Sequence, residues 1–342
     1  MDWRFPQPSF SRLYQMDQER FKAYLGGDWA AVEQRMHSAL SSDITLLNKA
    51  NDNILAHGGK KLRPILSLLV AKACNAGAAT EDSRRFAAAA ELLHNATLLH
   101  DDVADCSTER RGVPTTSSIF GNNASVLLGD FWLVRAMEQI LDADKSTNEV
   151  IRIFSKTLSD LAEGEMLQLQ KAVQCDTSSE DYYRIIYSKT ASLFEASCVS
   201  AAVSVGAPEE YVAAAREFGM KLGMAFQIKD DIMDYTAPDS LGKPALVDIK
   251  ERKITLPLLG ALVNVDAERN CAVRQMLATI GSNPGNASVI RDFVFDCGGI
   301  QYASESLDSF VSEAKRSLDV LPDSEAREYL KQLADYTAYR EK

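Results

Sequence analysis

Residues 86–104 read FAAAAELLHNATLLHDDVA, a stretch that is apolar almost all the way round when wound as a helix. It contains neither glycine nor proline, and it is rich in alanine and leucine, which favour helix. A helix with no polar face belongs in the interior of a bundle. The stretch ends in carboxylates, since the DDVAD run at 101–105 begins inside it. The segment therefore predicts a buried helix that carries an acidic cluster at its C-terminal end.

The sequence after this segment includes a long stretch with few helix breakers. The 93 residues from Thr115 to Ala207 contain no proline and only four glycines. Such a composition favours successive helices, and the alternating patterns typical of strands are absent from the sequence. Loops are expected at 106–117, 236–247 and 281–286, but none has the composition of a flexible linker. Although 342 residues often form two domains, we predict one all-α domain over 1–342.

Composition and charge narrow the possible functions. Hydrophobic residues make up 46% and charged residues 25% of the chain, which is the balance of a globular protein. The net charge is −11 and no basic block occurs, so nucleic acid is not an expected partner. An anionic substrate must therefore meet a local cationic patch or a bound metal ion.

Signals for membrane insertion, secretion and disulfide bonding are missing from the sequence. No uncharged apolar run approaches the ~18 residues of a membrane helix, and the start, MDWRFPQPSF, lacks the apolar region of a secretory signal. The six cysteines are at least 23 residues apart, so no CxxC pair is available for zinc or redox chemistry. We expect a soluble, cytoplasmic protein with reduced thiols.

A second acidic cluster repeats the spacing of the first. Residues 230–234 read DDIMD, which matches DDVAD at 101–105, and each cluster follows an apolar helical stretch. At 100° per residue the first and last aspartates differ by only 40°, so the carboxylates crowd one helix face. Divalent cations relieve such repulsion, and oxygen ligands select Mg²⁺ or Mn²⁺. A single motif of this kind is usually a solvated acidic face, whereas two copies at the same spacing favour a metal site.

Basic residues accompany the acidic clusters. GGKKLRP at 58–64 places Lys60 and Arg63 on one helix face, and Arg110 and Arg111 directly follow the first acidic cluster. Each of these cations alone could be a helix-end charge. Their position beside two acidic clusters makes the pattern specific.

These motifs resemble those of the trans-isoprenyl diphosphate synthase (polyprenyl synthetase) family in both order and spacing. The resemblance covers most of the chain and runs from GGKKLRP through LLHDDVADCSTERRG (98–112), GEMLQL (164–169) and KTASLF (189–194) to FQIKDDIMDY (226–235) and GKPALVDIKERKITLPL (242–258). It implies a single large helical bundle around a central cavity. It also implies a prenyltransferase that joins isopentenyl diphosphate to an allylic diphosphate and releases diphosphate.

The resemblance assigns the six clustered aspartates to catalysis, together with about three Mg²⁺ (or Mn²⁺) ions. Asp101 and Asp105 would bind two ions from one wall of the cavity, and Asp230 would bind the third from the other. The remaining carboxylates would support these ligands: Asp102, Asp231 and Asp234. Stabilising the diphosphate that leaves the allylic carbon is mainly an electrostatic task.

Two further groups of residues would bind the substrates. Isopentenyl diphosphate is expected in a metal-free basic pocket formed by Lys60, Arg63, His94 and Arg111, although His94 alone could be a core histidine. The allylic substrate is expected to meet Arg110, Lys189, Thr190, Gln227, Lys243 and Lys253. Lys189 is also expected to act in catalysis, and Thr190 and Gln227 match positions near the reacting carbons. No side chain is an obvious general base, so the released diphosphate is expected to remove the proton.

Product length can be argued from the helix that ends in the first acidic cluster. The growing chain should run back along this helix, one turn of which is about 5.4 Å. Thr97 lies one turn before Asp101 and Ala96 lies beside it; in the family, bulky aromatic residues at these positions close the pocket for short products. Because both are small here, we predict a medium- or long-chain product. Trp132 could form the floor of the tunnel.

Four alternatives can be weighed on the sequence. A short-chain farnesyl or geranylgeranyl diphosphate synthase would share the motifs. A class I terpene cyclase would not need the basic pocket. A non-catalytic subunit of a heteromeric synthase would typically have lost aspartates or arginines, and an acidic helical scaffold would carry the motifs by coincidence. The resemblance further implies a homodimer, and membrane contact is expected to be transient at most, through a lipid product.

Overall fold

The structure is a computed structural model of the chain, and it describes residues 18–110, 112–144, 147–236 and 246–340. These residues are mainly helical, so the predicted all-α fold is confirmed. The α-helices are α1 (Gln18–Leu25), α2 (Gly27–Ala39), α3 (Thr45–Ala56), α4 (Leu62–Cys74), α5 (Glu81–Ala104), α6 (Thr116–Phe120), α7 (Asn122–Leu141), α8 (Thr147–Gln174), α9 (Ser179–Ile186), α10 (Ser192–Ser204), α11 (Glu209–Thr236), α12 (Val247–Lys250), α13 (Leu256–Val263), α14 (Ala267–Ala278), α15 (Asn286–Asp296), α16 (Gly299–Ser317) and α17 (Glu325–Tyr339). A π-helix, η1 (Tyr187–Ala191), joins α9 to α10, and a 3-10 turn, η3 (Leu318–Val320), follows α16.

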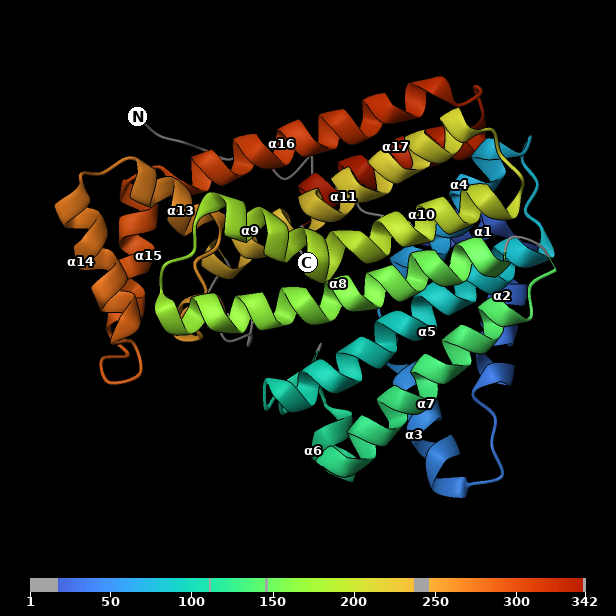
Figure 1. The fold of residues 1–342 in the computed structure, drawn as a ribbon, viewed down its shortest axis with the longest axis horizontal. Helices are drawn as coiled ribbons and strands as arrows, with labels where there is room; N and C mark the ends of the chain where they lie inside the picture. The colour runs from blue at the N-terminus through green and yellow to red at the C-terminus, as the bar shows by residue number, and fades with distance from the viewer. Residues whose placement is uncertain (1–17, 111, 145–146, 237–245, 341–342) are drawn as a thin grey trace.

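Helix α10 lies at the centre of the bundle (Figure 1). It packs against α11, which packs in turn against α16, and it also contacts α4, α5 and α8. Every residue of α10 except Glu195 is buried. This explains why its sequence is nearly continuously apolar or small. One cluster of buried apolar side chains extends from Phe21 in α1 to Ala338 in α17. Among the described residues, no helix combines the length and hydropathy needed to cross a bilayer.

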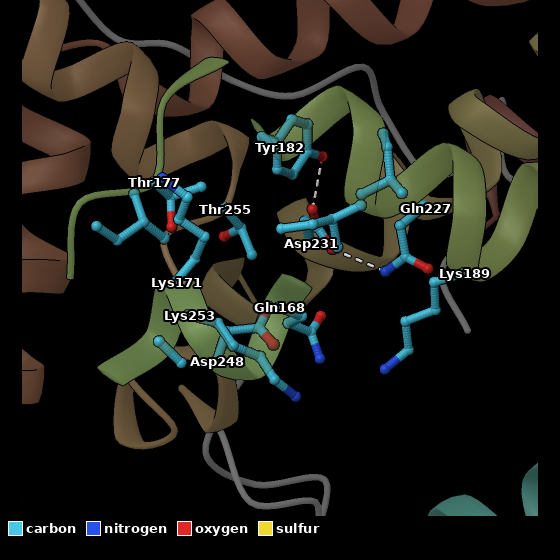
Figure 2. Close-up of a pocket in the computed structure, with 14 residues that line it drawn as sticks. Gln168, Lys171, Thr177, Tyr182, Lys189, Gln227, Asp231, Asp248, Lys253 and Thr255 are labelled. Carbon is cyan, nitrogen blue, oxygen red and sulfur yellow. Dashed lines mark hydrogen bonds between the residues drawn. The ribbon is translucent and has the colours of Figure 1, made fainter. Parts of the chain in front are cut away.

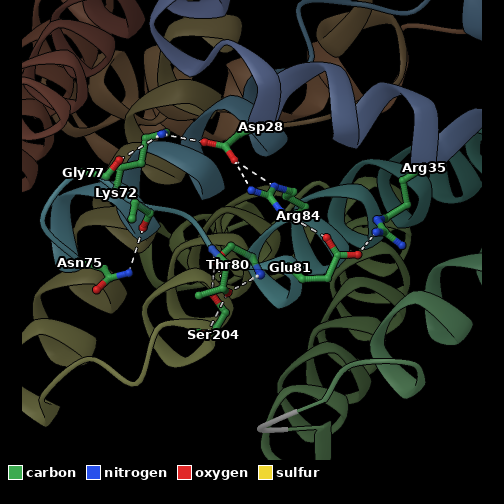
Figure 3. Close-up of polar contacts among 11 residues, drawn as sticks. Asp28, Arg35, Lys72, Asn75, Gly77, Thr80, Glu81, Arg84 and Ser204 are labelled. Atoms are coloured by element: carbon green, nitrogen blue, oxygen red, sulfur yellow. Dashed lines mark hydrogen bonds and ion pairs between the residues drawn. The ribbon is translucent and has the colours of Figure 1, made fainter.

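The predicted helix over 86–104 is confirmed, although α5 begins five residues earlier. The Thr80 side chain caps the helix by accepting a hydrogen bond from the Ser83 backbone N–H. The Ser83 hydroxyl oxygen in turn accepts a hydrogen bond from the Thr80 backbone N–H. Such a capping box fixes a helix start. Nearby, Asp28 of α2 accepts from Lys72 and Arg84, each at 2.7 Å, and so ties α2 to α4 and α5 (Figure 3).

The expected loop at 106–117 contains a small element that the sequence did not predict. Glu109–Arg110 (β1) pairs antiparallel with Val113–Pro114 (β2). This two-stranded ribbon turns the chain back toward the end of α5, which brings Arg110 close to the first acidic cluster. The loop at 281–286 is confirmed up to Gly285, since α15 starts at Asn286. Most of the loop at 236–247 lies outside the described residues.

Two glycines allow α11 to approach η1 and α10 unusually closely. A Cβ at Gly223 would lie 2.4 Å from the Cα of Ala191, and one at Gly219 would lie 2.7 Å from the Phe194 carbonyl oxygen. Both distances are shorter than side chains permit, and both involve backbone atoms. These contacts fix the second acidic cluster of α11 relative to η1.

Candidate active site

The first acidic cluster lies at the C-terminal end of α5 and faces α8 and η1. Asp101 is partly buried beside Glu165 of α8 and Lys189 of η1. Burial, together with the negative charge of Glu165, raises the pKa of Asp101 to about 6. The Lys189 ammonium lies 2.6 Å from Glu165 Oε1. Asp105, at the C-cap of α5, is exposed.

Asp102 has a different environment from its neighbour in the sequence. Its side chain is buried, and its Oδ1 accepts a hydrogen bond from Arg110 Nε at 2.8 Å. A buried carboxylate needs such a partner. The structure therefore places Arg110 beside the first acidic cluster, as expected. It also engages that guanidinium with Asp102, which fits the predicted supporting role of this carboxylate.

The three aspartates of the second cluster, at the end of α11, have three different sets of partners. Asp231 is buried and accepts from the Tyr182 hydroxyl at 2.6 Å and from Gln227 Nε2 at 2.9 Å. Asp234 accepts from the backbone N–H groups of residues 247 and 248 at 3.0 and 3.2 Å and so anchors α12. Asp230 is partly exposed, and its Oδ1 lies 2.8 Å from Arg340 Nη2.

A cavity lies beside the second cluster (Figure 2). Residues of α8, α9, η1, α11 and α12, and of the turns beside them, line it, among them Gln168 and Lys171 of α8, Lys189 of η1, Gln227 and Asp231 of α11, and Asp248 and Lys253 from α12 and the turn after it. Lys189 is in the π-helical segment, an irregular helix form that often occurs at functional sites. The cavity thus brings together Lys189, Gln227, Asp231 and Lys253, which the sequence predicted to act at one site.

Asp248 lines this cavity and Arg340 pairs with Asp230, although neither residue was predicted from the sequence. Burial and the nearby Asp234 raise the pKa of Asp248 to about 7. The Arg340 guanidinium, which follows α17, is buried against the Phe226 ring at 3.9 Å and donates to the Phe226 carbonyl oxygen as well as to Asp230. Asp248 lies in the GKPALVDIKERKITLPL stretch, which carried part of the family resemblance, whereas Arg340 had no sequence signal.

The carboxylates of the two clusters fit a divalent cation. Their donor atoms are all oxygens, and burial next to like charges raises the pKa of Asp101, a cost that a cation would relieve. Within the described ranges, no three acidic, histidine or cysteine side chains converge tightly enough to hold an ion alone. Mg²⁺ does not require such a cage, because it usually keeps several waters and binds one or two carboxylates plus substrate phosphates.

Part of the expected basic pocket lies next to the C-terminal helix and an aromatic pair. Lys60 donates to the Tyr336 hydroxyl of α17. Arg63 is buried, with its guanidinium 4.7 Å from the centre of the Phe194 ring, and Phe194 packs against Phe226 at 5.4 Å. The Phe226 ring in turn contacts Arg340, which pairs with Asp230 of the second acidic cluster.

The other predicted substrate residues are placed as follows. His94 is half-buried on α5, two turns before Asp101. The Thr190 hydroxyl donates to Gln227 Oε1 at 2.7 Å, which joins these two predicted residues directly. Lys253 pairs with Glu251 and lines the cavity. Arg111 and Lys243 lie outside the described residues.

The residues expected to control product length lie on α5 and α7. Ala96 is buried, and Thr97 is half-buried with its hydroxyl donating to the His94 carbonyl oxygen. Trp132 is fully buried on α7, where its indole N–H donates to Asn51 Oδ1 of α3 at 2.8 Å. Since α7 packs along α5, Trp132 stands across from the helix that carries Ala96. Whether this ring ends the tunnel stays a prediction.

An all-α bundle with aspartate clusters at the ends of α5 and α11, and with lysines beside a cavity, defines an enzyme of the isoprenoid synthase type. Residues 44–294 match the family model described as polyprenyl synthetase, and the chain belongs to this family. It is 38% identical to an all-trans-nonaprenyl-diphosphate synthase (geranyl-diphosphate specific) of Rhodobacter capsulatus, over 89% of this chain and 92% of the relative. It is 35% identical to octaprenyl diphosphate synthase of Escherichia coli, over 96% of this chain and 100% of the relative.

The fold of this chain is also similar to that of a solved polyprenyl synthase. The polyprenyl synthase of Caulobacter crescentus, complexed with calcium and isoprenyl diphosphate, aligns with a TM-score of 0.86 and 33% identity over 95% of this chain and 98% of that one. The predicted family, helical fold and prenyltransferase class are therefore confirmed.

Proposed function

We propose that this chain extends an allylic diphosphate with isopentenyl diphosphate to give a medium- or long-chain all-trans polyprenyl diphosphate. The observation that carries the proposal is the pairing of two acidic clusters, at the ends of α5 and α11, with Lys189 beside a cavity. The names of the two relatives, a nonaprenyl and an octaprenyl diphosphate synthase, support a product beyond the farnesyl stage.

In the proposed reaction the allylic C–O bond breaks and diphosphate leaves. A C–C bond then forms to isopentenyl diphosphate, and the resulting cation loses a proton to the released diphosphate. Bound Mg²⁺ would neutralise the leaving diphosphate. Asp101, Asp105 and Asp230 are the proposed metal ligands because the family resemblance assigns them this role; each carboxylate is at least partly exposed, and Asp230 would exchange its contact with Arg340 for the ion. The relative from Caulobacter crescentus was solved as a complex with calcium and isoprenyl diphosphate, which supports the use of a divalent cation.

The remaining residues are proposed to bind and orient the substrates. Lys189, Lys253, Arg110 and Lys243 would hold the allylic diphosphate. Lys60, Arg63, His94 and Arg111 would hold isopentenyl diphosphate without a metal. Buried guanidinium groups such as Arg63 bind phosphate strongly because little water competes. The carboxylates of Asp102, Asp231 and Asp234 are engaged with protein donors, which supports a role in orienting their neighbours.

We also propose that the chain forms a single domain and assembles as a homodimer. Three apolar side chains on α7, Leu127, Val134 and Leu141, are spaced by seven residues, and each is more than half exposed. Such a stripe favours a partner helix. Replacing Leu127 and Val134 together by glutamate should turn a dimer into monomers in light scattering, whereas a monomeric wild type would contradict the proposal.

A direct assay tests the activity. Purified protein is incubated with Mg²⁺, labelled isopentenyl diphosphate and a short allylic primer, and the products are separated by chromatography. We expect chains longer than the three-unit farnesyl product; mainly three-unit product would contradict the proposed chain length, and no condensation would contradict the activity. We also propose a cytoplasmic location, where thiols stay reduced; the six cysteines are all free thiols, which supports it.

A further inference from the structure

A chain of hydrogen bonds connects Tyr182 of α9 to Thr190 of η1 through α11. The Tyr182 hydroxyl donates to Asp231 Oδ2 at 2.6 Å, and Gln227 Nε2 donates to the other oxygen, Oδ1, at 2.9 Å. The Thr190 hydroxyl donates to Gln227 Oε1 at 2.7 Å. Figure 2 shows Tyr182 and Gln227 bonded to the same carboxylate. The side chains of Tyr182, Asp231 and Thr190 are all buried, so little water competes for these bonds.

These hydrogen bonds all run in one direction, because each side chain acts as a donor or as an acceptor at a fixed atom. Asp231 accepts at both oxygens, from the Tyr182 hydroxyl and from Gln227 Nε2, so the Gln227 amide turns its NH₂ group to Asp231 and its oxygen to Thr190. Thr190 has a single hydroxyl proton and donates it to Gln227, so its oxygen offers only lone pairs to other groups. The chain therefore leaves an acceptor rather than a donor at Thr190. Acceptors stabilise a centre at which positive charge develops, as at the allylic carbon when diphosphate leaves.

The position of Tyr182 explains why the Asp231 carboxylate keeps its orientation. Its hydroxyl occupies Oδ2, which leaves Oδ1 for Gln227. The Tyr182 ring is itself held by an edge contact with Tyr183 at 5.4 Å. Burial and the adjacent Asp231 charge raise the pKa of the Tyr182 hydroxyl well above 10, so it remains protonated and able to donate.

We propose that Tyr182 is a positioning residue for prenyl transfer: by fixing the Asp231 carboxylate it sets the direction of the hydrogen bonds through Gln227 to Thr190. The inference rests on the proposed function only in placing Gln227 and Thr190 beside the reacting carbons. It predicts that Tyr182 affects the chemical step and not the capture of either diphosphate.

The test is the Tyr182→Phe variant, which keeps the ring and removes only the hydroxyl. We expect kcat to fall about tenfold or more, while KM for each diphosphate stays within about twofold. Tyr183→Phe is the matched control: it removes a neighbouring hydroxyl that does not contact Asp231, and its kcat should stay within about twofold of wild type. A Tyr182→Phe variant with wild-type kcat, or with the same fold-change in KM as in kcat, would overturn the proposal.

A double-mutant cycle separates this role from general packing. Thr190→Val removes the other end of the chain, so adding Tyr182→Phe to it should cause little further loss of kcat. If the fold losses of kcat in the two single variants multiply in the double variant, Tyr182 acts independently of the hydrogen bonds to Thr190.

If Tyr182→Phe does not fold, 3-fluorotyrosine at position 182 keeps the ring and makes the hydroxyl a stronger donor; unchanged kcat would then overturn the proposal, and altered kcat at constant KM would support it. Wild-type turnover, measured in parallel, tests the proposed function separately.

Discussion

The Asp101→Asn variant should make the metal-free protein more stable while abolishing its activity. Asp101 has a pKa of about 6 in the folded protein, against an ordinary value of 3.8, because of burial and the charge of Glu165. A raised pKa means that folding favours the protonated carboxyl. The contribution of the protonated Asp101 carboxyl group to the free energy of unfolding is therefore fully present below pH 4 and is lost as the pH rises through about 6. At pH 7.5 the folded protein carries the full cost of the charged carboxylate.

The magnitude follows from the size of the pKa change. The rise from 3.8 to about 6 corresponds to about 3 kcal/mol, an upper figure because solvent reaches part of the side chain. Asparagine has nearly the same shape without the charge. The variant should therefore gain up to about 3 kcal/mol at pH 7.5, or about 3 to 5 °C in melting temperature for a chain of this length. The gain should vanish near pH 4.

Thermal unfolding in a chelator, followed by circular dichroism from pH 4 to pH 8, measures this difference. Asp52→Asn, which removes an exposed aspartate on α3, is the control and should change stability by less than about 0.5 kcal/mol at every pH. With Mg²⁺ and both substrates, Asp101→Asn should lower turnover about a hundredfold or more, because a proposed metal ligand is lost. A melting temperature that does not rise at pH 7.5, or a gain that persists at pH 4, would refute the reasoning.

Four further predictions test other parts of the site. In steady-state kinetics, Arg63→Ala should raise KM for isopentenyl diphosphate more than for the allylic substrate, and Arg110→Ala should do the reverse; equal effects on both substrates would contradict this division. Ala96→Phe should shorten the product seen by chromatography, while Trp132→Ala should lengthen it if the ring ends the tunnel, at a stability cost of about 3 to 5 kcal/mol. A chelator should stop turnover and leave the helical circular dichroism signal unchanged, so retained turnover would exclude an essential metal. Arg252→Gly should stabilise the fold by about 1 kcal/mol in thermal unfolding, because Arg252 has a positive φ of 60°, and a loss of stability would contradict this.

Local sequence patterns predicted much of the fold and the position of both acidic clusters. The apolar run of α5 and the spacing of its carboxylates are periodic features that a single segment reveals. The same patterns could not distinguish the aspartates within a cluster. Asp230 and Asp231 are adjacent in the sequence, yet one pairs with Arg340 and the other with Tyr182. Their roles differ because their partners come from different helices.

The residues that sequence reasoning missed act through such long-range contacts. Arg340 is 110 residues from Asp230 and has no neighbouring motif, and Tyr182 is 49 residues from Asp231. Periodicity and capping carry no information about contacts of that range. The ribbon at Glu109–Arg110 was also missed, because two-residue strands leave no alternating pattern. A family resemblance supplied the roles of the cations, which spacing alone left open.

The close contacts at Gly219 and Gly223 bear on how this enzyme can change in evolution. Any side chain at either glycine would push α11 away from η1 and α10, so these two positions are confined to glycine. Ala96 lies on α5, outside these contacts, and a larger residue there leaves both glycines untouched. The proposed product-length residue Ala96 thus shares α5 with Asp101 but lies outside the close contacts of α11 with η1 and α10. A lineage can acquire lipids of new length by substitutions on α5 while inheriting the same catalytic step.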